Sequence, residues 1–276
     1  MADEQSPAVV AAIAAQIALL LIGCVALWRV QFRRRAERQP VRLPKWGISG
    51  FEFALAAFLV LAGAFVGQLS LALVPVADPD NQLIAQSAGF QGGLLLGALA
   101  AVRALRRASA SVASPGEVMM PAGRLTAGLV TFLASLPVVS LISWGWTLLL
   151  EHLGFPTDRQ EMLGIFARAD SPLMTALVIF LAVVVAPIVE ELVFRAGLFR
   201  YLNQRLPRVA ALMLPAVVFG SLHGNLVAFA PLVVLGIIFS LAYERTGSIA
   251  VPMIAHGLFN LNTLVLLLVG LDIESP

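Results

Sequence analysis

Two adjacent glutamates and an arginine lie inside an apolar segment of this 276-residue chain. They are Glu190, Glu191 and Arg195, and the sequence before them, 172–189, is almost wholly apolar. A charged side chain near a bilayer centre costs about 2.5–3.5 kcal/mol on insertion scales, so charged residues kept there indicate a functional site. A carboxylate in such a place suits general acid–base chemistry, because it can take a proton from water and return it.

The spacing of these three residues predicts different roles for the two glutamates. Glu191 and Arg195 are four residues apart, so a helix places them on one face, with the acid before the base, which is the favourable order for an ion pair. Glu190 is rotated from Glu191 by about 100°. We therefore predict that Glu191 and Arg195 support the structure and that Glu190 remains available for chemistry.

Three further polar residues could reach the same depth as Glu190. Glu190 and His223 each lie 15 residues from a turn at 205–208, which corresponds to about 22 Å along a helix. His256 and Asn260 share a helix face at a comparable distance from the next turn. A single histidine or asparagine between helices can simply be a packing hydrogen bond. The convergence of four such groups favours a catalytic site.

The composition predicts the elements that position these residues. The chain is 59% hydrophobic and 12% charged, whereas soluble domains carry about 25% charged residues. We therefore predict an all-α, polytopic transmembrane bundle of about eight helices. The expected helices are at 8–30, 49–76, 83–102, 125–149, 172–199, 208–223, 226–243 and 250–271. Residues 1–124 would supply N-terminal helices and basic loops, and residues 125–276 the catalytic core, within a single membrane domain.

The basic residues follow a topological pattern. Of the 18 lysines and arginines, 16 fall on alternate connections between the predicted helices. This is the positive-inside pattern, and it predicts a multi-pass protein of the cell membrane with both termini outside the cytoplasm. It also explains the net charge of +2 without nucleic-acid binding. The N-terminus has no basic region of the kind that precedes a cleaved signal, so the first helix is expected to be a retained anchor.

The sequence also predicts the surroundings of several residues outside this group of four. Cys24 is the single cysteine, which rules out a disulfide framework and a cysteine-based metal site. His152, beside Glu151, is expected to be a solvated loop residue. Residues 156–168 fit a short interfacial helix. Small-residue spacings that permit close helix contact occur at Gly63 and Gly67 and at Gly93 and Gly97. The isolated glutamines Gln68, Gln86 and Gln91 are expected to form interhelical hydrogen bonds.

Three short motifs resemble those of the CPBP family of intramembrane proteases, also called Abi proteins, which includes CaaX prenyl endopeptidases and bacteriocin-processing enzymes. EELVFR at 190–195 resembles the first motif, FGSLH at 219–223 the second (aromatic-x-x-x-His), and HGLFN at 256–260 the third (His-x-x-x-Asn). They occur in the family's order, and the resemblance covers about residues 155–270. One departure is Ala196, where glycine commonly follows the arginine.

The resemblance implies peptide-bond hydrolysis within the membrane. Glu190, helped by His223, would activate a water molecule, and His256 with Asn260 would form the oxyanion hole. Glu191 and Arg195 would hold the helix geometry. The substrate would be a membrane-associated protein or peptide, lipidated or carrying a leader. No cofactor is expected.

Alternatives remain at this point. Family members are often labelled metalloproteases, and zinc could bind Glu190, His223 and His256, although the chain has no HExxH helix. The protein could instead be a catalytically silent scaffold or immunity factor that keeps the motifs for stability. An ion-coupled transporter using Glu190 is less favoured, because no inverted repeat is visible.

Overall fold

The computed structural model describes residues 7–29, 43, 46–76, 78–108, 121–157 and 172–269. Within this part of the chain, seven helices are long and apolar enough to cross a membrane, and a shorter apolar helix lies at 208–222. The eight predicted helices are confirmed, and the protein is an all-α, multi-pass membrane protein. The interfacial helix expected at 156–168 falls, from residue 158 onward, outside the described residues.

Two compact units are distinguished by their internal contacts. The first comprises Met1–Arg42, Met119–Arg168 and Leu212–Pro276, and the second comprises Leu43–Val118 and Ala169–Ala211. The division expected from the sequence, with N-terminal helices and basic loops at 1–124 and a catalytic core at 125–276, stays a prediction.

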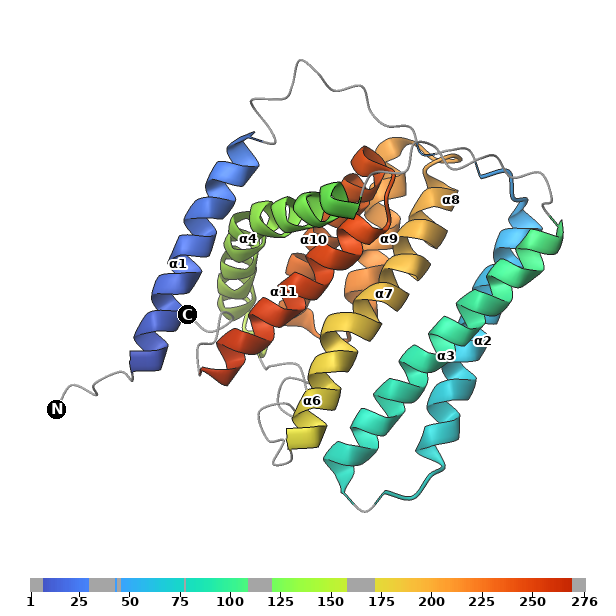
Figure 1. Cartoon of the computed structure of the whole chain (residues 1–276), viewed down its shortest axis with the longest axis horizontal. Helices are drawn as coiled ribbons and strands as arrows, with labels where there is room; N and C mark the ends of the chain where they lie inside the picture. The colour runs from blue at the N-terminus through green and yellow to red at the C-terminus, as the bar shows by residue number, and fades with distance from the viewer. Residues whose placement is uncertain are drawn as a thin grey trace. The chain divides into compact units, whose positions relative to one another are not determined.

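The first unit is built around one long helix, α4. Its apolar core contains Phe132 and Leu136 of α4, Phe239 of α10 and Ala255 of α11. The helices α1, α10 and α11 all pack against α4 (Figure 1). The bounds are Pro7–Trp28 for α1, Pro121–His152 for α4, Arg208–Leu222 for α9, Leu226–Thr246 for α10 and Ala250–Leu268 for α11.

The connection between α9 and α10 places His223 at a helix end. Helix α9 has 15 residues, about 22 Å, which is less than the roughly 30 Å hydrocarbon core. Gly224 has a φ of 64°, a conformation that favours glycine and ends the helix. Asn225 then caps α10 by accepting a hydrogen bond from the backbone nitrogen of Ala228 at 2.8 Å. His223 therefore lies in a turn, at the end of a helix shorter than the other apolar helices.

Helices α2 (Gly50–Ala72) and α3 (Pro79–Ala108) of the second unit lie side by side (Figure 1). Glycines allow this contact: a Cβ atom at Gly63 would overlap the backbone of Gly93, and one at Gly67 would overlap the backbone of Gly89. The small-residue spacings seen in the sequence thus mark the place where two backbones meet.

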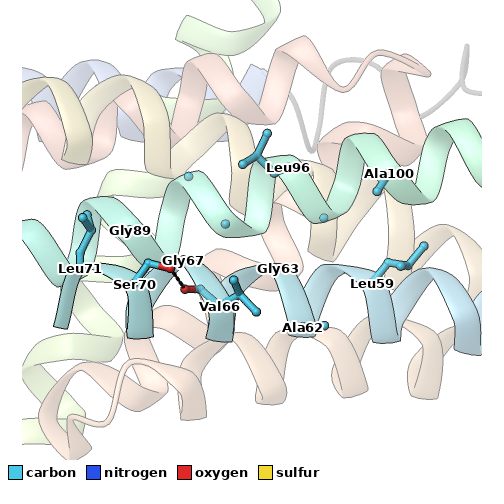
Figure 2. Close-up of a pocket in the computed structure, with 13 residues that line it drawn as sticks. Leu59, Ala62, Gly63, Val66, Gly67, Ser70, Leu71, Gly89, Leu96 and Ala100 are labelled. Carbon is cyan, nitrogen blue, oxygen red and sulfur yellow. Dashed lines mark hydrogen bonds between the residues drawn. The ribbon is translucent and has the colours of Figure 1, made fainter. Parts of the chain in front are cut away.

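A shallow groove runs between α2 and α3 (Figure 2). Its walls are small and apolar residues such as Gly63, Gly93 and Leu96, with Ser70 among the few polar ones. The hydroxyl of Ser70 donates to the carbonyl oxygen of Val66 within its own helix at 2.7 Å. No titratable side chain lines this groove, so the acid–base groups lie elsewhere.

The fifth membrane span carries the glutamates and changes its helix type along its length. Pro187 supplies no backbone N–H, and its ring disfavours a normal α-turn before it, which accounts for the π-helical stretch immediately upstream. A second π-helical stretch follows Glu191. The successive segments are α6 (Pro172–Phe180), η2 (Leu181–Val185), α7 (Ala186–Glu191), η3 (Leu192–Phe199) and α8 (Arg200–Leu202).

The end of this span is tied to the chain before α2. The backbone nitrogen of Trp46 donates to Oε1 of Gln204 at 2.9 Å, and the guanidinium of Arg205 donates to the carbonyl oxygen of Ile48. The ring of Tyr201 stacks on Phe53, with centroids 3.7 Å apart. Aromatic and basic residues of this kind anchor helix ends at a membrane interface.

Candidate active site

Glu191 and Arg195 form a buried ion pair. Glu191 is 0% exposed and Arg195 is 1% exposed, and Nη1 of Arg195 lies 2.7 Å from Oε1 of Glu191. The pair spans four residues across the boundary of α7 and η3, as the spacing predicted. Two charges removed from solvent require such a partner, because either one left alone would be costly.

Glu190 has different surroundings, although it is the next residue. It is half-buried, and its Oε1 accepts a hydrogen bond of 3.3 Å from Nε2 of Gln91 in α3. Arg195 interacts electrostatically with Glu190 as well as with Glu191. The direct 2.7 Å contact of the guanidinium is nevertheless with Glu191. The two carboxylates thus differ in burial and in hydrogen-bond partner.

His223 is oriented by the helix that it follows. Its Nδ1 lies 2.8 Å from the carbonyl oxygen of Phe219. A carbonyl oxygen can only accept, so Nδ1 carries the proton in this contact. In the neutral ring, Nε2 is then the unprotonated nitrogen, able to accept a proton. His223 is exposed, which leaves this nitrogen accessible.

His256 lies in the interior of the first unit, 3% exposed. The ring of Phe219 meets it nearly at right angles, with centroids 6.0 Å apart, and Phe239 lies on another side at 5.3 Å. The same Phe219 ring also contacts His223 edge-on at 4.8 Å. Phe219 therefore contacts both histidines. In the sequence it is marked only as the aromatic residue of the second motif.

Asn260 follows His256 by one helical turn on α11 and is half-buried. The four-residue spacing places both side chains on one face of that helix. His152 is exposed beside Glu151, as predicted, but it is the last residue of helix α4 rather than a loop residue.

The predicted site residues thus form two groups. Glu190, Glu191 and Arg195 belong to the second unit, and His223, His256 and Asn260 belong to the first. The pairing of Glu191 with Arg195 is observed, and the meeting of the glutamate with the histidines stays a prediction. The interhelical hydrogen bond expected of Gln91 is confirmed, but its partner Glu190 was not predicted, and the contacts of Phe219 with both histidines were not predicted either. The only sequence signal for Gln91 was its isolation in an apolar helix.

The described residues of each unit taken alone contain no cluster of three histidine, cysteine, aspartate or glutamate side chains that could hold a metal ion. The zinc alternative needs Glu190 from one unit together with His223 and His256 from the other. A glutamate and two histidines are suitable zinc ligands by type, and zinc at this place stays a prediction.

Comparisons with known proteins agree with the motifs. Residues 172–262 match the family model described as type II CAAX prenyl endopeptidase Rce1-like. An uncharacterized protein of Mycoplasma capricolum subsp. capricolum is 25% identical over 272 residues, which cover 94% of this chain and 76% of that protein. "Putative membrane peptidase YdiL" of Bacillus subtilis is 30% identical over 122 residues, 44% of this chain and 50% of that protein. No solved structure matches the chain.

All three motifs fall inside the matched residues, and the matched region crosses from the fifth span to the last helix. The resemblance predicted from the motifs is therefore confirmed, and the match supports a membrane-embedded protease. Over residues 172–262 the chain is similar to the Rce1-like type II CAAX prenyl endopeptidases.

Proposed function

We propose that this protein is an intramembrane endopeptidase that uses Glu190 as its general base. The observation that supports this role most directly is the difference between the two glutamates. Glu191 is fully buried against Arg195, whereas Glu190 is half-buried and its Oε1 accepts a hydrogen bond from the amide of Gln91. A structural ion pair and a chemically competent carboxylate can thus stand side by side in one helix.

In the proposed reaction, Glu190 takes a proton from a water molecule while the water oxygen adds to the carbonyl carbon of the scissile bond. His223, with Nδ1 donating to the carbonyl oxygen of Phe219, keeps Nε2 unprotonated, so that it can carry the proton from Glu190 to the leaving amine when the carbon–nitrogen bond breaks. His256 and Asn260 donate to the oxyanion that forms. When the carbon–nitrogen bond breaks, the proton held by Glu190 passes to the leaving amine. The products are a carboxylate and a new amino terminus.

The substrate we propose is a membrane-associated protein or peptide that is lipidated or carries a leader segment. The many apolar side chains exposed on the helices, such as Phe51 and Phe58 of α2 at 78% and 65%, are suited to a lipid bilayer. A substrate attached to the same bilayer reaches the enzyme by lateral diffusion, which favours this class over freely soluble proteins.

Proteomics of membrane fractions tests the function. Wild type would be compared with Glu190→Ala, His223→Ala and Glu191→Ala, and with His152→Ala as a matched control for loss of an exposed histidine. Cleavage products present in wild type and His152→Ala should disappear in Glu190→Ala and His223→Ala. A wild type that produces no cleavage products, or a Glu190→Ala variant with unchanged products, would favour the scaffold instead.

The proposed mechanism uses no cofactor, and this is testable separately. Purified protein treated with a chelator and exchanged into metal-free buffer should keep full activity. Loss of activity that added zinc restores would favour the metal-dependent alternative with Glu190, His223 and His256 as ligands.

A further inference from the structure

We propose that Gln91 is a positioning residue for Glu190 and that its side-chain oxygen holds the attacking water. This inference rests on the proposed function. It concerns α3, which lies outside residues 172–262 that match the family, and so assigns part of the site to the N-terminal half of the chain.

Packing between α3 and the fifth span brings Gln91 to Glu190. Leu94 of α3 is buried in one apolar cluster with Val189 of α7, and Leu95 packs against this cluster. Gln91 precedes these leucines by three and four positions, so it lies on the same helix face one turn away. The face of α3 that packs against α7 therefore places the Gln91 amide next to the Glu190 carboxylate.

The hydrogen bond determines which way the amide points. Nε2 of Gln91 lies 3.3 Å from Oε1 of Glu190. An ionised carboxylate can only accept, so the amide nitrogen must face it. A donor on one oxygen fixes the plane of the carboxylate, and with it the direction in which the other oxygen meets a water molecule.

The other end of the amide is the second observation. Oε1 of Gln91 is buried and has no hydrogen-bond partner among the residues that the structure describes. Buried acceptors are nearly always paired, by protein or by an ordered water. A water molecule beside Glu190 would satisfy this oxygen by donating one hydrogen to it, while its other hydrogen points to the carboxylate that removes it.

Three variants separate positioning from packing. Gln91→Leu removes both the donor and the acceptor at similar volume, and Gln91→Glu keeps the shape and an acceptor oxygen but loses the amide donor. Gln68→Leu is the matched control, because Gln68 is an exposed glutamine of α2. The substrate probe is a synthetic peptide containing the cleavage sequence identified in wild-type membranes, assayed with purified full-length enzyme in lipid vesicles.

Gln91→Leu should lower kcat by about 10- to 100-fold, the range expected for a hydrogen bond to a charged group, with KM changed less than twofold. Gln91→Glu should lower kcat at least as far. The thermal midpoint of Gln91→Leu should stay level or rise, because an apolar side chain leaves no unpaired buried oxygen. Gln68→Leu should match wild type in kcat and KM.

Wild-type kcat in Gln91→Leu would overturn the inference. So would a kcat loss that comes with a lower thermal midpoint in both Gln91 variants, since packing alone would then explain it. The proposed function fails separately: it is lost if Glu190→Ala remains active. If Glu190→Ala is inactive and Gln91→Leu is fully active, only the role of Gln91 is wrong.

Discussion

At the scale of single residues, the neighbouring glutamates of α7 have different surroundings, which suits the structural role and the chemical role proposed for them. The rotation between consecutive helical positions directs Glu191 to Arg195 and Glu190 to Gln91. A single residue of spacing thus separates a fully buried ion pair from a half-buried carboxylate with a neutral donor. This difference predicts that substitution of Glu191 lowers the stability of the fold much more than substitution of Glu190.

Removing one partner of the buried pair should destabilise the fold. We expect Glu191→Gln to lower the free energy of unfolding by about 3–5 kcal/mol, because the buried Arg195 would lose the charged partner that lies 2.7 Å from it. Glu190→Gln should change it much less. The double variant Glu191→Leu/Arg195→Met should recover most of the loss, since apolar residues of similar volume need no partner. Chemical denaturation in micelles measures all four proteins, and equal losses for both glutamates would contradict the assignment.

The proposed oxyanion donors should act on catalysis rather than on binding. His256→Ala and Asn260→Ala should each lower kcat by about 10²–10³-fold with little change in KM, because they would bond an oxyanion present only in the transition state. Kinetic assays with the peptide probe measure this split. His152→Ala should behave as wild type. A rise in KM at constant kcat would instead assign these residues to substrate binding.

At the scale of elements, hydropathy predicted the eight helices. Helix α10, expected to end at residue 243, continues to Thr246 and is followed by Gly247, whose φ is 65°. The π-helical stretches could not be predicted, because the spacing of apolar residues does not distinguish a π-helical turn, which holds one extra residue, from an α-helical turn. The partner of Gln91 was also beyond sequence reasoning. The two residues of that hydrogen bond are 99 positions apart, and only the packing of α3 against α7 brings them together.

Adjacent glycines of α3 offer a sharp test of this packing. A Cβ at Gly93 would overlap the backbone of Gly63, whereas a Cβ at Gly92 meets nothing within 4 Å. Gly93→Ala should therefore destabilise the protein by about 1–3 kcal/mol. Gly92→Ala should be neutral or stabilise by up to about 1 kcal/mol through helix propensity. Thermal unfolding compares the two.

The same pair of variants bears on catalysis. Displacement of α3 in Gly93→Ala should weaken the contact of Gln91 with Glu190 and lower kcat, while Gly92→Ala keeps it. Equal stability and activity in both variants would show that close approach of α2 and α3 is not required.

At the scale of the whole molecule, the proposed hydrolysis would use residues from both compact units. The family match crosses the two units, since it runs from 172 to 262 and the first unit resumes at Leu212. Residues that act together on one water molecule are not additive. Glu190→Ala/His223→Ala should therefore lose no more kcat than the worse single variant. Losses that multiply would indicate that the two residues act in separate steps or places.

The arrangement of basic residues predicts how the molecule lies in the membrane. The connection between the first two helices carries seven of the 18 lysines and arginines, and short basic connections stay in the cytoplasm. Arg195, although basic, is buried in an ion pair, so the turn after the fifth span relies on Arg200, Arg205 and Arg208. With eight helices, both termini should then lie outside the cytoplasm.

Reporter fusions to the full chain in a bacterial host test this orientation. Alkaline phosphatase, which is active only outside the cytoplasm, should be active when fused after residue 276. A fluorescent protein that folds only inside should fluoresce when inserted at 30–42 and stay dark when fused after residue 276. The reverse pattern would place the basic connections outside. Fluorescence both at 30–42 and after residue 276 would instead show that the short helix α9, at 15 residues, does not count as a full crossing, since removing one crossing moves only the C-terminus to the other side.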